Sequence, residues 1–333
     1  MTVNDGKRDS RQPLLSVRNL RTWFATQVRD VFAHSSYLKA VDDVSFDIDR
    51  RETFGLVGES GCGKTTVGRT IVRLYKPQSG QILFDGTDIA NLDSRGMMPF
   101  RRRMQMIFQD PYASLNPRMT VEGIISEPLR LQGADKAAAR ERVLYLIDRV
   151  GLKRDHLNRY PHEFSGGQRQ RIGIARALAT GPEFIVCDEP ISALDVSIQA
   201  QVINMLEEMQ DEMGIAYLFI SHDLSMISHI SHRVGVMYLG HMVEMADMAE
   251  LYRHHLHPYT TALMSAVPVA DPDLAASSQR IVLQGDVPTP INPPSGCPFR
   301  TRCAHCAARC AEVRPEMREV APGHWLACHV MGG

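Results

Sequence analysis

A glycine-rich motif of eight residues constrains this chain more than any other feature of its sequence. Residues 58–65 read GESGCGKT and match G-x-x-x-x-G-K-[ST] at every position. The motif follows the apolar run 54–57 and precedes a segment with helical periodicity, which is the strand–loop–helix context that it requires. In such a loop, backbone N–H groups and the start of the next helix point at phosphate groups. The motif therefore predicts a site for the phosphates of a nucleotide.

The residue types of this motif give most of its positions a role. Lys64 should reach the β- and γ-phosphates, and the Thr65 hydroxyl should hold Mg²⁺. Cys62 stands at an unconstrained position, so no chemistry is assigned to it. The residues expected to bind the nucleotide here are Gly58, Ser60, Gly61, Cys62, Gly63, Lys64, Thr65 and Thr66.

Around the motif, short apolar runs alternate with helical segments. The apolar runs that carry few charges, as buried parallel strands do, are 54–57, 184–187, 216–220 and 234–238. Helical periodicity covers 65–75, 137–150, 168–179 and 198–213. This alternation predicts an α/β fold with a doubly wound sheet. Residues 111–165 are mostly helical and lack buried-strand runs, so we expect them to be inserted between two halves of that sheet.

Composition narrows the possible partners. The chain of 333 residues has 37 Lys+Arg against 38 Asp+Glu, a net charge of -1, which gives no electrostatic case for binding nucleic acid. No stretch approaches the ~18 apolar residues of a membrane span. Residues 1–12 are polar and lack the apolar core of a signal peptide. We therefore expect a soluble, cytosolic chain whose connection to a membrane comes through a partner.

Two carboxylates follow the apolar run 184–187. Enzymes with this phosphate-binding motif need an acidic group on Mg²⁺ at the end of a neighbouring strand, and Asp188 fits that role. Glu189, one residue further on, can polarise the attacking water as a general base. Cys187 lies within the apolar run, and we expect it to belong to the core.

A second potential anion site opens the helical segment 168–179. Ser165 followed three residues later by Gln168 is a capping box, which explains these two residues. It does not explain Gly166 and Gly167, which weaken a helix start unless something must approach the backbone closely. The chain thus offers two helix N-termini suited to phosphate.

The complete set of motifs resembles that of the ABC-transporter ATPases. The set comprises residues 58–65, Gln109, 165–168, Asp188 with Glu189, Asp195 and His222. Phe164 stands directly before Ser165, at a position where the family has leucine. The resemblance implies a P-loop NTPase (RecA-like) fold: an ABC nucleotide-binding domain with an antiparallel β subdomain, an inserted helical subdomain and a Cys-rich C-terminal extension.

The resemblance also implies roles for residues outside the phosphate loop. Gln109 would sense Mg²⁺, His222 would contact the γ-phosphate and Asp195 would bridge two subunits. The segment 165–168 of one subunit would close on the γ-phosphate held by the other. Counting along the family pattern from Asn19 places the adenine-stacking ring at Phe24, with Trp23 as the alternative.

Further stretches are similar to the ATPases of dipeptide and oligopeptide importers, in particular the second, F-type subunit. They are FQDPYASLNP at 108–117, RYPHEFS at 159–165 and HPYT at 257–260. The resemblance implies peptide import with a second ABC ATPase subunit, two membrane permeases and a solute-binding protein, at the cytoplasmic face of the inner membrane. Related systems carry nickel, oligosaccharides or glutathione, so these solutes remain alternatives. A non-transport ATPase acting on nucleic acid or ribosomes is the alternative of a different class.

Five of the seven cysteines crowd the last forty or so residues. In a reducing compartment such a cluster favours metal binding over disulfides. In the resembled importers four matching cysteines are associated with a 4Fe–4S cluster, which carries over to Cys297, Cys303, Cys310 and Cys328. Spacing alone does not separate this cluster from a zinc site, and Cys306 is extra. We expect a small tail with little core, stabilised by the metal.

The expected domain organisation follows from these assignments. Residues 1–12 form a disordered tail, and 13–250 form the nucleotide-binding domain, with its helical subdomain at about 111–165. A proline-rich stretch near 267–294 leads into the cysteines, and 251–333 form the C-terminal extension.

Overall fold

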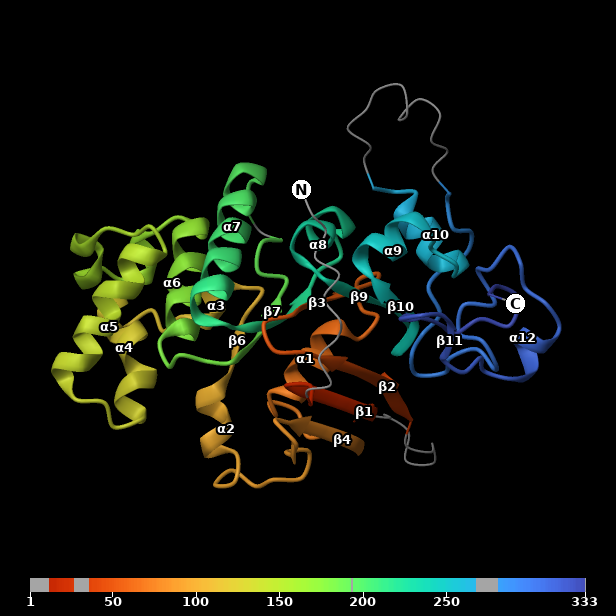
Figure 1. The fold of residues 1–333 in the computed structure, drawn as a ribbon, viewed down its shortest axis with the longest axis horizontal. Coiled ribbons are helices and arrows are strands. Elements are labelled where there is room, and N and C mark those ends of the chain that lie inside the picture. Colours follow the sequence, from red (N-terminus) through yellow and green to blue (C-terminus); the bar gives the residue numbers. More distant parts are fainter. Residues whose placement is uncertain (1–11, 27–35, 193, 268–280, 333) are drawn as a thin grey trace.

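The computed structural model describes residues 12–26, 36–192, 194–267 and 281–332. The predicted disordered tail therefore lies outside the described residues except for Gln12, and part of the proline-rich stretch lies outside them as well. The described chain contains two sheets with helices packed around the larger one (Figure 1).

The larger sheet has eight strands in the order β11-β12-β10-β9-β3-β8-β7-β6. Strands β9, β3, β8, β7 and β6 are parallel, and the other three continue the sheet in antiparallel fashion. The parallel strands β3, β7 and β8 are wholly buried, which explains their nearly continuous apolar sequences. The bounds are β3 (Thr53–Val57), β6 (Met104–Ile107), β7 (Phe184–Asp188), β8 (Ala216–Ile220), β9 (Arg233–Tyr238), β10 (His241–Asp247), β11 (Arg318–Ala321) and β12 (His324–Leu326).

The smaller sheet is antiparallel, with the order β2-β1-β4-β5, and α1 lies between it and the larger sheet. Val67 and Ile71 of α1 are fully buried in the core that joins the two sheets. Gly68 lets α1 approach β7, since a Cβ there would lie 2.7 Å from Cγ1 of Val186. The bounds are β1 (Leu15–Ala25), β2 (Tyr37–Ile48), β4 (Ser79–Phe84), β5 (Thr87–Asp88) and α1 (Lys64–Ile71).

The helices that lie between β6 and β7 in the sequence gather at one end of the molecule (Figure 1). Polar caps start them: Thr120 caps α4, Asp135 caps α5 and Ser165 caps α6. In this segment the bounds are α3 (Pro111–Ser114), α4 (Val121–Leu131), α5 (Lys136–Arg149), η1 (Arg154–Asn158), η2 (Pro161–Glu163) and α6 (Gly166–Leu178). The other helices are α2 (Met98–Arg103), α7 (Val196–Met213), α8 (Leu224–Ile230), α9 (Met248–Arg253), α10 (Pro258–Met264) and α12 (Arg309–Glu312).

The cysteine-rich stretch is not the small tail with little core that its sequence suggests. Cys297, Phe299 and Cys310 are buried in the main hydrophobic core, and β12 pairs with β10 so that β12 and β11 extend the large sheet. The expectation fails because β11 and β12 are too short to show a strand pattern of their own, while long-range pairing with β10 creates them.

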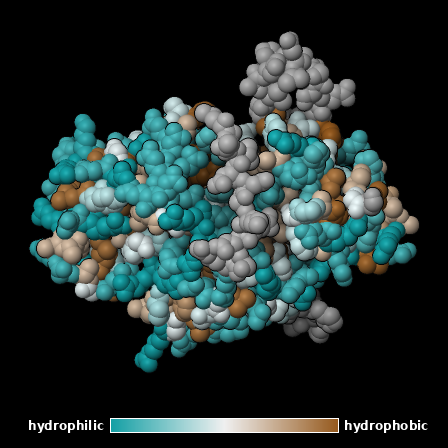
Figure 2. All heavy atoms as spheres, viewed as in Figure 1, coloured by the Kyte–Doolittle hydropathy of each residue, from teal (hydrophilic) through white to brown (hydrophobic). Residues whose placement is uncertain are grey.

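Hydrophilic residues predominate on the face of the molecule seen in Figure 2, with hydrophobic ones scattered among them. Among the described residues, no helix combines the length and the apolar character needed to cross a bilayer.

Candidate functional site

Four loops meet at the carboxyl edge of the parallel strands. The P-loop, residues 58–65, follows β3, and Gln109 follows β6. Asp188 ends β7 with Glu189 directly after it, and His222 follows β8. Because β3, β8, β7 and β6 are neighbours in the sheet, these predicted site residues lie at one edge. Ligands of open α/β sheets bind outside this edge.

The P-loop needs its glycines for space as well as for conformation. Gly58 has φ 149°, and a Cβ there would lie 2.2 Å from the carbonyl oxygen of Met237. Gly63 has φ 109°, and its Cβ would lie 2.1 Å from the carbonyl oxygen of Ala40. Side chains at these positions would collide with backbone, which does not move easily. The close approach of the neighbouring backbone therefore requires glycine at both positions of the predicted phosphate-binding loop.

Lys64 is buried beneath the loop. Its Nζ donates hydrogen bonds to the carbonyl oxygens of Gly58 at 2.6 Å and Glu59 at 3.0 Å. Cys62 is also buried, and burial raises the pKa of its thiol. A raised pKa disfavours the reactive thiolate, so Cys62 has the environment of a packing residue. Of the other loop positions, Ser60 and Gly61 are exposed and Thr66 is half-buried.

A threonine and an aspartate form a polar pair at the start of α1. The Thr65 hydroxyl donates to Oδ1 of the fully buried Asp188 at 2.7 Å. Burial raises the pKa of Asp188, while Thr65 and Arg69 act in the opposite direction. Among the described residues, Oδ2 of Asp188 accepts no hydrogen bond and has only the Arg69 guanidinium at 3.8 Å. A buried carboxylate oxygen with lone pairs to spare, beside a hydroxyl, fits a hard cation such as Mg²⁺.

Arg69 is a site residue that our sequence analysis missed. It lies four residues after Thr65 on α1, so both side chains share one helix face. The four-residue spacing from Thr65 could have identified Arg69 from the sequence. Its contact with Asp188 could not be predicted, because that contact depends on the order of the strands in the sheet.

Glu189 brings together residues from three strand ends. Gln109 Nε2 donates to Glu189 Oε2 at 2.9 Å, and His222 Nδ1 lies 3.4 Å from the same oxygen. His222 and Gln109 are exposed, whereas Glu189 is half-buried. A carboxylate held by an amide and an imidazole at the mouth of the site is placed to accept a proton from a water molecule.

The start of α6 has the predicted capping box. Ser165 Oγ accepts from the Gln168 backbone N–H, and the Gln168 side chain accepts from the Ser165 backbone N–H. The two glycines differ: a Cβ at Gly166 would meet no described atom within 4 Å, whereas one at Gly167 would lie 2.9 Å from Cγ2 of Ile198. Packing against α7 thus accounts for Gly167, and only Gly166 keeps an open backbone. Phe164, at the atypical position, is buried against His156.

The α6 start and Asp195 stand apart from the P-loop in this chain. Ser165 and Gly166 are exposed, as is Asp195 at the start of α7. Within the described part of the chain, no hydrogen bond or ion pair joins Ser165, Gln168 or Asp195 to the P-loop.

Both candidate adenine rings lie on β1 and are half-buried. Phe24 packs edge-on against Tyr75, with ring centroids 5.2 Å apart. Trp23 lies 6.2 Å from Tyr37, and Lys39 Nζ lies 5.0 Å from its ring centroid. These contacts do not distinguish the two candidates.

The four predicted metal-binding cysteines share one environment. Burial raises the pKa of Cys297 to about 11, and Cys310, Cys328 and Cys303 add to that rise. Among the described residues, however, no three His, Cys, Asp or Glu side chains lie close enough together for a single metal ion. Cys306 is exposed, and its thiol is directed to the Ala307 carbonyl oxygen.

Backbone N–H groups point at three of these sulfur atoms. Val330 donates to Cys328 Sγ at 3.4 Å. Backbone hydrogen bonds from Phe299 and His305 oppose the rise in the pKa values of Cys297 and Cys303. In each case the donor lies two residues after the cysteine. Hydrogen bonds to sulfur are a feature of metal-bound thiolates.

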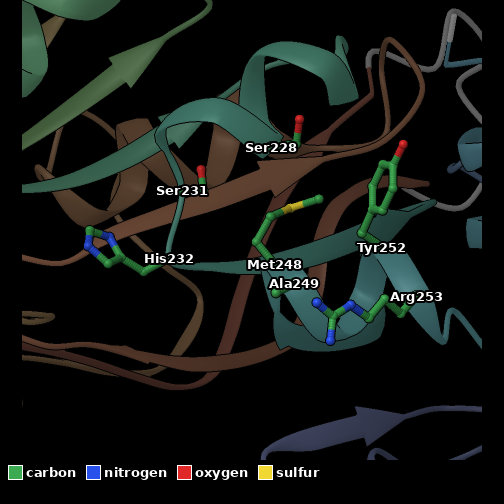
Figure 3. A pocket seen from close by; sticks show the side chains of 7 residues that line it. All are labelled: Ser228, Ser231, His232, Met248, Ala249, Tyr252 and Arg253. Carbon is green, nitrogen blue, oxygen red and sulfur yellow. The ribbon is translucent and has the colours of Figure 1, made fainter. Parts of the chain in front are cut away.

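A pocket of about 400 Å³ lies elsewhere, between α8 and α9 (Figure 3). Figure 3 shows Ser228, Ser231 and His232 on one side of it and Met248, Tyr252 and Arg253 on the other. None of the predicted site residues lines this pocket.

Two protein-family models match the chain. Residues 41–192 match "ABC transporter", and residues 243–310 match "Oligopeptide/dipeptide transporter, C-terminal region". The first match contains the P-loop, Gln109, the α6 start, Asp188 and Glu189, whereas His222 lies between the two matches.

Full-length relatives and solved structures agree with these matches. The chain is 55% identical to the putative oligopeptide transport ATP-binding protein YkfD of Bacillus subtilis, over 96% of both chains. It is 49% identical to the oligopeptide transport ATP-binding protein OppF of Haemophilus influenzae, over 98% of this chain and 99% of that one. The ADP- and phosphate-bound dimeric ATP-binding cassette MJ0796 superposes with a TM-score of 0.63 and 25% identity, over 70% of this chain and 98% of the other.

Proposed function

This chain belongs to the ATP-binding proteins of ABC transporters, and from that premise we propose that it hydrolyses ATP to power the import of oligopeptides through partner membrane subunits. The observation that carries the proposal is the meeting of Lys64, the Thr65–Asp188 pair and the Gln109–Glu189–His222 group at one edge of the sheet. Relatives that are 49% to 55% identical over nearly the whole chain are named oligopeptide transport ATP-binding proteins.

Each group at the site has a task in this reaction. The P-loop N–H groups and Lys64 bind the phosphates of ATP, and Glu189 accepts a proton from the attacking water. Gln109 and His222 orient the Glu189 carboxylate. Thr65 and Asp188 are the residues to hold Mg²⁺, which when bound would stabilise negative charge on the phosphate oxygens. Phe24 stacks on adenine.

The exposed α6 start acts on a second nucleotide. Ser165, Gly166, Gly167 and Gln168 of one protomer close on the γ-phosphate that the P-loop of a second ABC ATPase subunit holds, and Asp195 bridges the two protomers. The exposure of Ser165 and Gly166, and their separation from this chain's own P-loop, support that arrangement. The cassette MJ0796 is described as dimeric. A helix start presenting free N–H groups suits an incoming phosphate.

The rest of the assembly follows from this role. We assign residues 13–250 to the nucleotide-binding domain, with residues about 111–165 as its inserted helical subdomain, and 251–333 to the C-terminal extension. The second ATPase is a different subunit, and the pair drives two membrane permeases that a solute-binding protein supplies. The chain then works at the cytoplasmic face of the membrane as a peripheral subunit.

ATP-dependent association tests this function. The Glu189→Gln variant should bind MgATP but turn it over at least ~10²-fold more slowly than the wild type, because the amide cannot accept the proton. With hydrolysis blocked, the variant should associate upon addition of MgATP, alone or with its sister ATPase, in analytical ultracentrifugation. The Glu208→Gln substitution, at an exposed position of α7, is the control for charge loss. Turnover near that of the wild type, or no MgATP-dependent association, contradicts the proposal.

A 4Fe–4S cluster bound by Cys297, Cys303, Cys310 and Cys328 is the second part of the proposal, with zinc as the alternative. The mutual influence of the four thiols supports it, as do the N–H groups directed at three of them. When bound, the group would crosslink the loops that carry these residues.

Metal analysis decides between the two groups. Protein purified without oxygen should be brown and contain iron and inorganic sulfide in near-equal amounts. Cys328→Ser should lose the colour, whereas Cys306→Ser, in the same stretch, should keep it. Colourless wild-type protein that holds zinc tightly would refute the cluster.

A further inference from the structure

Two side chains of the C-terminal region bind Glu59, the second residue of the P-loop. The Glu59 carboxylate forms a two-pronged ion pair with Arg302: Nη1 lies 2.7 Å from Oε2, and Nη2 lies 3.0 Å from Oε1. The backbone N–H of Glu59 donates to the Tyr259 hydroxyl at 2.7 Å. Both partners lie more than 190 residues further along the chain, in the part that matches the oligopeptide/dipeptide transporter C-terminal region.

The two anchors are rigid. The Arg302 side chain is only 7% exposed, against 28% for Glu59, and its guanidinium lies 5.9 Å from the Tyr238 ring centroid. Tyr238, Tyr259 and Phe299 pack together, with ring centroids 4.8 to 5.4 Å apart. A planar fork that meets a carboxylate at two points fixes its orientation as well as its position.

The contacts that hold Glu59 are linked to the phosphate-binding lysine. Lys64 Nζ donates to the carbonyl oxygens of Glu59 itself and of the preceding residue, Gly58. A shift of Glu59 would therefore move an acceptor that positions the ammonium group.

We infer that Arg302 is a positioning residue for the nucleotide site: through Glu59 it fixes the P-loop and Lys64, so that the C-terminal region sets the affinity for nucleotide. The inference rests on the proposed ATP-binding function. It gives the C-terminal region a task in the ATPase itself, in addition to any metal that it holds.

Binding of MgADP to the full-length chain, measured by calorimetry, tests this role. Arg302→Gln and Glu59→Gln should each weaken MgADP binding by about tenfold, equivalent to about 1.4 kcal/mol. The double variant should bind no more weakly than either single variant, because both changes remove the same interaction. Arg302→Lys keeps the charge but loses the two-point contact of the guanidinium. Its affinity for MgADP should lie between that of the wild type and that of Arg302→Gln.

Arg300→Gln is the matched control. It removes the same charge from the same loop, but the Arg300 guanidinium donates to Ser295 within that loop, and among the described residues it makes no hydrogen bond to the P-loop. Its MgADP affinity should stay within twofold of the wild type. In steady-state hydrolysis, Arg302→Gln should raise KM for ATP and leave kcat within about twofold, since Gln109, Glu189 and His222 are untouched. A purely structural role would instead lower the active fraction, and thus kcat, at unchanged KM.

The outcomes separate the two proposals. If the wild type binds MgADP and folded Arg302→Gln binds it as tightly as Arg300→Gln does, the positioning role is wrong. If Arg302→Gln does not fold, the MgADP affinity of Glu59→Gln tests the positioning role instead. This variant should fold, because Glu59 is partly exposed and glutamine has nearly the same shape as glutamate. Absence of MgADP binding by the wild type counts against the proposed function itself.

Discussion

Glu189 has a backbone conformation that few residues of its type adopt. Its φ of 45° lies in the left-handed region, which costs a non-glycine residue on the order of 1–3 kcal/mol. The backbone N–H of Glu189 donates to the Ile220 carbonyl oxygen at 3.0 Å, and the Ser192 hydroxyl donates to the Glu189 carbonyl oxygen at 3.1 Å. These bonds hold a bend directly after β7. The strain thus coincides with the contacts of the carboxylate to Gln109 and His222.

His257 is a single residue whose titration should make the fold sensitive to acid. Burial lowers its pKa to about 3, while its Nδ1 accepts the Tyr259 backbone N–H as the cap of α10. The unfolded chain takes up this proton near pH 6.5, so stability is present above that pH and is lost as the pH falls toward 3. Between pH 7 and pH 5.5, His257 should reduce the free energy of unfolding by about 1 kcal/mol.

Urea unfolding of His257→Asn at these two pH values checks this. Asparagine keeps a cap acceptor but does not titrate, so the variant should lose about 1 kcal/mol less than the wild type on acidification. The exposed His162→Asn is the control and should behave as the wild type does. An equal loss in all three proteins shows that His257 is not the source.

At the scale of elements, the start of α6 offers two neighbouring glycines with different tasks. Gly166→Ala should leave stability unchanged or slightly higher, because its Cβ meets no described atom and alanine favours a helix. Gly167→Ala should lower Tm by a few degrees, because its Cβ presses on Ile198 and overpacking typically costs about 1–3 kcal/mol.

Their effects on ATP hydrolysis should be reversed. Gly166→Ala puts a methyl group on the open backbone where the second protomer's phosphate is to approach, and should lower turnover at least about tenfold. Gly167→Ala should lower it less once the folded fraction is taken into account. Melting curves and steady-state ATPase assays measure both. Full activity of Gly166→Ala would contradict the second phosphate site.

The sequence identifies the elements of this fold better than their long-range partners. The P-loop, α6 with its capping box, and the buried strands carry local signals, and the structure has them within a few residues of the predicted bounds. Strands β11 and β12 went unpredicted because they are short and join the sheet through pairing of β12 with β10, about 80 residues earlier in the chain. The same limit hid Arg302 and Tyr259, since no local pattern links either to Glu59. Gln109 and His222 were assigned to the site from family resemblance alone, and their contacts with Glu189 were not predicted.

At the scale of the whole molecule, one sheet runs from the helical end to the cysteine-rich end. Strand β12 contributes His324, whose Nε2 lies 2.8 Å from the fully buried Glu244 carboxylate of β10. The backbone N–H groups of Leu256 and His257 donate to the same carboxylate. Removing His324 would take one hydrogen-bond partner from this buried carboxyl group, which is destabilising. The boundary at 250/251 therefore separates regions that share buried contacts.

Cooperative unfolding of both ends is the consequence, and the two tryptophans can report it. Trp23 lies on β1 of the antiparallel sheet and Trp325 on β12, so Trp23→Phe leaves a reporter of the C-terminal end and Trp325→Phe one of the N-terminal end. Because β12 and the buried Phe299 share the main sheet and core, the fluorescence midpoints of the two variants in urea should coincide with each variant's own midpoint by circular dichroism. A separate, earlier transition of Trp325 would show that the C-terminal region unfolds as an independent unit, in which case its grip on Glu59 could loosen without loss of the nucleotide-binding fold.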